Sequence, residues 1–101
     1  MIRHVVMWKL KDPALAAHFK ARLDSCGDLT EGILAYDVGI RTPGLEANVD
    51  VVLVSAFSNA AALAAYQNHP HHKAVSGELG QLRESRHVLD VEMARTNERT
   101  E

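Results

Sequence analysis

The sequence predicts an α+β fold of the ferredoxin-like type, with strands and helices in the order βαββαβ. Four segments alternate between apolar and polar residues, as half-buried strands do, and the regions between them carry apolar residues at helical spacing. Proline, glycine, serine, asparagine or aspartate stands at the junctions, where turns and helix caps are needed. We therefore expect a four-stranded antiparallel sheet with its helices on one face and the first and third strands at its centre.

The chain of 101 residues suits one domain, which we assign to residues 1–93, followed by a polar tail over residues 94–101. Apolar residues make up 47% of it, as is typical of a globular protein. A net charge of -2 gives no electrostatic reason to expect a nucleic acid or an anionic membrane as partner. No apolar run approaches the roughly 20 residues that span a bilayer. With one cysteine, Cys26, and no signal-peptide pattern, the expected location is the cytoplasm.

The first strand covers residues 2–10, where side chains alternate between two faces. One face carries Ile2, His4, Val6, Trp8 and Leu10, and the other carries Arg3, Val5, Met7 and Lys9. If the first of these faces looks into the interior, His4 is a pocket residue, and Val6 and Trp8 line the pocket beside it. The other interpretation of His4 is a core histidine that donates to a backbone carbonyl.

The first helix begins at Asp12, which serves as its N-cap, with Pro13 in the first turn. Its buried stripe consists of Leu15, Phe19 and Leu23. The helix ends near residues 26–28, where a glycine suits the position after a helix. Two strands follow, over residues 33–41 and residues 49–57, separated by a Pro-Gly turn.

The second helical region is interrupted in its middle. Residues 58–59 supply an N-cap for an alanine-rich helix over residues 60–68. His69 and Pro70 then break it, because proline disfavours helical backbone before it and fits the first turn of a new helix. The buried side of that new helix carries Val75, Leu79 and Leu82. The last strand is expected at residues 87–93.

Both central strands are apolar on both of their faces, although the helices can cover only one face of the sheet. The bare face would be a larger apolar patch than a soluble monomer usually exposes. A second copy packed sheet against sheet as an isologous dimer would cover it. We therefore predict a homodimer through the open sheet face, which forms a dimeric α+β barrel.

The strongest candidates for catalytic residues lie within residues 66–72, Tyr-Gln-Asn-His-Pro-His-His. Three histidines lie close together there, and histidine exchanges protons near neutral pH. His72, facing inward, could serve as a general base, or it could hold the helix break as a cap or packing residue. Tyr66 could be its acid partner, or its ring could pack on the sheet.

The other two histidines of the cluster receive structural interpretations. His69 most simply caps the break, and His71 faces solvent if His72 faces inward, since neighbours on a helix point about 100° apart. A metal site formed by the three histidines lacks the i, i+4 spacing that converges on a helix, and no cysteine or carboxylate in the cluster completes the ligand set. We predict no metal and no cofactor.

Three places in the chain resemble the stress-responsive A/B barrel (Dabb) domains, which are small dimeric α+β barrels with a ferredoxin-like protomer. Residues 2–10 resemble the family's opening strand, with its early histidine and an aromatic-lysine pair. Residues 66–72 resemble its Tyr-x-x-His-Pro-x-His signature, and residues 88–92 resemble its closing strand. The resemblance covers residues 1–93.

The resemblance implies two classes of function. Most members have no assigned activity. In the first class the chain is therefore a homodimer without catalytic activity that binds a small apolar molecule in its barrel. A plant polyketide cyclase of the family performs a cofactor-free aldol condensation with its tyrosine and last motif histidine as an acid-base pair. The matching residues are Tyr66 and His72, with His4 as an orienting group. A further histidine in the third strand of that cyclase has no counterpart in residues 49–57.

Overall fold

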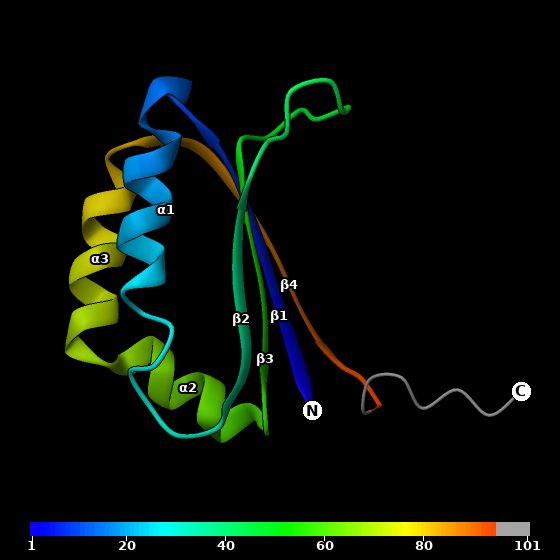
Figure 1. The fold of residues 1–101 in the computed structure, drawn as a ribbon. Coiled ribbons are helices and arrows are strands. Elements are labelled where there is room, and N and C mark those ends of the chain that lie inside the picture. The colour runs from blue at the N-terminus through cyan, green and yellow to red at the C-terminus, as the bar shows by residue number, and fades with distance from the viewer. Residues whose placement is uncertain (95–101) are drawn as a thin grey trace, which may run out of the picture.

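β1 (Ile2–Leu10) lies inside a four-stranded antiparallel sheet in the computed structural model, which describes residues 1–94 (Figure 1). It pairs with β3 (Val51–Phe57) on one side and with β4 (Arg83–Glu92) on the other. β2 (Ile33–Ile40) pairs with β3 at the opposite edge. The strand order β2-β3-β1-β4 places the first and third strands at the centre, as the sequence predicts.

Within the described residues, three α-helices pack on one face of the sheet and leave the other face bare (Figure 1). They are α1 (Ala16–Asp24), α2 (Ala60–Asn68) and α3 (Pro70–Gly80). This arrangement confirms the predicted ferredoxin-like α+β protomer. None of these helices is long and apolar enough to cross a bilayer. The polar tail predicted for residues 94–101 lies, apart from Ala94, outside the described residues.

The structure moves several of the predicted boundaries, including the ends of α1 at Asp24 and of β4 at Glu92. β4 begins at Arg83 and not at residue 87, because its polar first residues pair with β1 without showing an apolar alternation. β3 begins at Val51 and not at residue 49, since the Asp50 carboxylate takes the place of a backbone carbonyl and accepts from Leu10 N at 2.8 Å. β2 ends one residue early. The first helix opens with a 3-10 turn over Pro13–Leu15 before α1 begins.

The core lies between the helices and the sheet. Side chains of the central strands meet the inner sides of the helices there. The largest fully buried ones include Phe19 of α1, Leu53 and Phe57 of β3, Tyr66 of α2 and Val75 of α3. The even-numbered residues of β1 belong to this layer, so the face that carries His4, Val6 and Trp8 looks inward.

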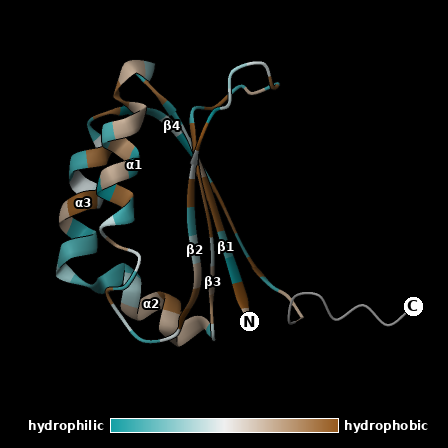
Figure 2. Ribbon diagram, viewed as in Figure 1, coloured by the Kyte–Doolittle hydropathy of each residue, from teal (hydrophilic) through white to brown (hydrophobic). Residues whose placement is uncertain are grey.

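The bare side of the sheet carries apolar side chains as well. The strand register aligns Val5, Met7, Val52, Val54, Leu89 and Val91 on this side, which we call the open apolar face. Leu89 is 64% exposed and Met7 is 39% exposed. In Figure 2, hydrophobic residues run along β1 although helices cover the sheet on one side only. The face remains without a cover in the single chain.

Candidate functional site

A cavity of about 310 Å³ lies between the helices and the sheet. Apolar side chains of β1, β3 and α3, among them Val6, Trp8, Leu53 and Val75, form much of its wall. Its polar side chains are His4, Tyr66, His72, Ser76, Arg83 and Arg86. The exposed lining of the cavity is more polar than apolar, so a bound small molecule would meet several hydrogen-bonding groups beside the apolar side chains.

His4 reaches the cavity from β1 and is held in place by Asp90 of β4. The two residues are cross-strand neighbours, and His4 Nδ1 hydrogen-bonds to Asp90 Oδ1. His4 is 3% exposed and Asp90 is 40% exposed, so the carboxylate lies nearer the surface than the ring. A carboxylate beside Nδ1 keeps the proton of the neutral ring on that atom and leaves Nε2 as an acceptor. The partner of His4 is thus a carboxylate and not a backbone carbonyl.

Tyr66, in the last turn of α2, is buried, and its hydroxyl lies 2.9 Å from the hydroxyl of Tyr36 in β2. Tyr36 donates its single proton to the Leu23 carbonyl at 3.0 Å, so Tyr66 must be the donor of the Tyr66–Tyr36 bond. Burial raises the pKa of Tyr66 to about 12 and raises the pKa of Tyr36 as well, so both hydroxyls remain protonated near neutral pH. Tyr66 therefore offers the cavity an acceptor oxygen, and becomes a donor there only by leaving Tyr36.

His72, in the first turn of α3, lies directly beside Tyr66. The centroids of the two rings are 4.5 Å apart. Its Nδ1 atom is buried and has no hydrogen-bond partner within residues 1–94. Burial lowers the pKa of His72 and nearby His4 adds to this, while the backbone of Gln67 acts in the opposite direction. A neutral imidazole on a cavity wall can accept a proton, which is the requirement for a general base.

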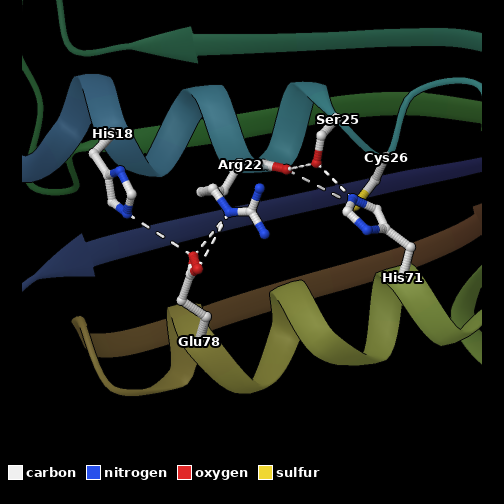
Figure 3. A network of polar contacts seen from close by, with 6 residues as sticks. All are labelled: His18, Arg22, Ser25, Cys26, His71 and Glu78. Atoms are coloured by element: carbon white, nitrogen blue, oxygen red, sulfur yellow. Dashed lines mark hydrogen bonds and ion pairs between the residues drawn. The ribbon is translucent and has the colours of Figure 1, made fainter.

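Polar contacts connect α1 and its C-terminal end to α3, at two places along that helix (Figure 3). Arg22 donates to Glu78 at 2.9 Å, and His71 Nε2 lies 2.8 Å from the Ser25 hydroxyl. His69 caps α3 as predicted, because its Nδ1 accepts from the backbone N–H of His71 at 3.0 Å. His71, which we expect to face solvent, is half-buried, and its ring makes an exposed hydrogen bond with the Ser25 hydroxyl at the C-terminal end of α1.

The structure brings His4, Tyr66 and His72 to one cavity, with Val6 and Trp8 in the same wall. The three histidines of the His-Pro-x-His stretch, by contrast, diverge, since one caps the helix, one contacts α1 and one faces the cavity. In the part of the chain that the structure describes, no three histidine, cysteine or acidic residues are placed to hold a metal ion.

The structure places four further residues at the site that the sequence patterns do not identify, namely Tyr36, Arg83, Arg86 and Asp90. Asp90 gives a partial signal, since an acid inside an apolar strand faces the side opposite to its neighbours Leu89 and Val91. Only the antiparallel register with β1 identifies its partner as His4. Tyr36 gives no signal, because a tyrosine in a strand is common and its contact with α2 is tertiary.

Taken together, the cavity contains a neutral imidazole, a second imidazole oriented by a carboxylate, and a tyrosine hydroxyl. His72 can take a proton from a bound molecule, and His4 can accept a hydrogen bond through Nε2. Groups of these types around one cavity are suited to acid-base chemistry on a small oxygenated compound.

Comparison with known proteins adds a family and a set of related folds. A sequence model of the family described as Stress responsive A/B Barrel Domain matches residues 2–93. A dimeric protein of unknown function with a ferredoxin-like fold from Bacteroides fragilis is 27% identical, with a TM-score of 0.75 over 91% of this chain and 95% of that chain. A dimeric ferredoxin-like protein from Thermobifida fusca is 20% identical, with a TM-score of 0.80 over 91% of this chain and 90% of that chain.

A third solved structure shares the fold and comes from an enzyme. SnoaB, a cofactor-independent oxygenase from Streptomyces nogalater, is 13% identical, with a TM-score of 0.76 over 97% of each chain. At this identity the likeness shows the fold alone. No curated protein matches the chain.

We expect the His72 imidazole to titrate below its ordinary pKa of 6.5. Between the lowered pKa and 6.5 the unfolded chain binds more protons at this residue than the folded chain does, so the free energy of unfolding falls as pH drops through that window. NMR titration of the ring and urea unfolding at about pH 7 and about pH 5 measure the two effects. His72→Gln should remove this part of the pH dependence, and His71→Gln should keep it. A His72 midpoint at or above 6.5 would contradict the expectation.

Proposed function

The chain belongs to the stress-responsive A/B barrel domain family, and on that premise we propose that it is a homodimer that binds a small, largely apolar molecule inside its barrel. The observation that carries the proposal is the cavity of about 310 Å³, in which apolar side chains of β1, β3 and α3 lie beside six polar side chains. We place the protein in the cytoplasm, a location supported by a single cysteine, Cys26, that has no partner cysteine in these 101 residues.

The open apolar face supports the dimer. Its side chains extend over three strands, β1, β3 and β4, and Leu89 and Met7 are substantially exposed in the single chain. A soluble monomer rarely leaves such a face uncovered, whereas a two-fold pair of identical sheets buries the same patch on both copies. The proteins from Bacteroides fragilis and Thermobifida fusca with this fold are dimeric, which supports the same assembly.

Acid-base catalysis without a cofactor is our second candidate function, and the contact between His4 and Asp90 favours it. Burying a histidine beside a carboxylate costs folding free energy, and such arrangements occur preferentially at functional sites. The oriented ring can hold a substrate oxygen there. In this proposal His72 removes a proton from the carbon next to a carbonyl, and the electron pair moves to the carbonyl oxygen. Tyr66 turns its proton from Tyr36 to that oxygen, and His4 orients the substrate through Nε2.

We expect the neutral ketone 4-phenylbutan-2-one to bind in the cavity and to change the fluorescence of Trp8, the single tryptophan, which is 6% exposed in the cavity wall. Ser76→Phe should weaken binding by about tenfold or more, because the ring occupies cavity space. Ala74→Phe, on the exposed side of the same helix, should leave the Kd unchanged. Equal affinity in the two variants would place the ketone outside this cavity.

For the dimer, we expect sedimentation equilibrium at micromolar concentration to give twice the chain mass of 11.1 kDa. Leu89→Lys should produce a monomer, because it places a charge on the open apolar face. Leu45→Lys is the matched control, since Leu45 is 69% exposed but lies in the turn between β2 and β3. A wild-type monomer, or a dimer that survives Leu89→Lys, would remove the open apolar face as the interface.

For catalysis, we expect the protein to speed the exchange of the α-protons of 4-phenylbutan-2-one with deuterium in D₂O, followed by NMR. His72→Gln should lower the exchange rate at least about a hundredfold, the usual contribution of a general base. Tyr66→Phe and Asp90→Asn should lower it less, and Lys73→Gln, an exposed cation outside the cavity, should not change it. Exchange no faster than with free imidazole would leave the protein as a binding domain alone.

A further inference from the structure

Two arginines of β4, Arg83 and Arg86, line the cavity next to its apolar wall. On a regular strand, residues three apart point to opposite faces, so both could not reach one cavity. The register between β1 and β4 shifts at this point: Arg86 pairs with Trp8, and Arg83 pairs with Leu10. Trp8 and Leu10 both point inward. This bulge therefore turns both arginines to the cavity side, a known use of bulges beside binding sites.

The charged side chains that line the cavity are positive, and the carboxylate of Asp90, which does not line it, is hydrogen-bonded to His4. No aspartate or glutamate lines the cavity, while two guanidinium groups do. Within residues 1–94 neither Arg83 nor Arg86 has a carboxylate within ion-pairing distance, whereas Arg22 and Arg41 each pair with one. Glu84, which lies between the two cavity arginines, pairs with Lys9. The two charges thus remain available for an anion from outside the chain.

Arg86 lines the same cavity as Tyr66 and His72. Burial is the main influence on the pKa of both Tyr66 and His72, and the positive charge of Arg86 is a further one that acts to lower both. Because Arg86, Tyr66 and His72 line one cavity of about 310 Å³, one small molecule can contact all three. Arginine binds carboxylates with two parallel hydrogen bonds, which fix orientation as well as charge.

We infer that the ligand of the cavity is an apolar or aromatic carboxylic acid, whose carboxylate binds Arg83 and Arg86 while its apolar body lies along Val6, Trp8 and Leu53. This inference rests on the proposed function of the cavity and adds the chemical class of the molecule. It also sets the direction of binding, with the acid group at β4 and the remainder of the molecule towards Tyr66 and His72.

The test compares 4-phenylbutanoate with 4-phenylbutanamide, which have nearly the same shape and differ in charge. Calorimetry and Trp8 fluorescence should show that the carboxylate binds about tenfold or more tightly than the amide. Arg86→Gln should abolish this preference, Arg83→Gln should reduce it, and Arg86→Lys should keep part of it. Lys73→Gln removes an exposed positive charge of the neighbouring helix and should leave the preference unchanged.

The outcomes separate this inference from the proposed function. Equal affinity of acid and amide for the wild-type protein overturns the inference and leaves the apolar cavity as a binding site. A preference that survives in both the Arg83→Gln and the Arg86→Gln variants, each folded by circular dichroism, also overturns it. Binding of neither compound, without any response of Trp8, overturns the inference and the proposed function together.

Discussion

The position of β1 between two antiparallel partners is the constraint on which the rest of the structure depends. Because side chains alternate along a strand, pairing on both edges fixes which half of β1 faces the helices and which half faces away. His4, Val6 and Trp8 thereby enter the cavity wall, and Val5 and Met7 join the open apolar face. A shift of the register by one residue would exchange the two sets, so one pairing sets both the cavity and the face that we assign to a dimer.

Within the cavity, the arrangement of the polar groups reflects the free-energy cost of burying a hydrogen-bonding atom without a partner. His4 meets this demand through Asp90, and Tyr66 meets it through Tyr36 and then the Leu23 carbonyl. These bonds turn protons away from the cavity and leave acceptor atoms facing it. Burial acts on His72 in the same direction, since it favours the neutral ring. The free cavity is therefore organised to accept protons, while its positive charge comes from the arginines of β4.

Local patterns predicted much of this molecule. The alternation of residues 2–10, the caps at Asp12 and Asn59, and the break at His69-Pro70 each depend on neighbours within a few positions, and each appears in the structure. The prediction of β4 failed at its start for the same reason, since its polar first residues show no alternation and become a strand only by pairing with β1. The contact of His71 was not predicted because its partner, Ser25, lies at the end of another helix.

The sequence by itself determined the order of strands and helices, the alternation of β1 between two faces and the motif that identifies the family, because these follow from spacing along the chain. The tertiary structure decided which side chains meet. His4 and Asp90 are 86 positions apart and Tyr36 and Tyr66 are 30 apart, and no local rule connects them. The bulge that turns Arg83 and Arg86 to one side also arises only when β4 is paired. Backbone conformation is set by nearby residues, whereas the chemistry of a site depends on contacts that exist only after the sheet has formed.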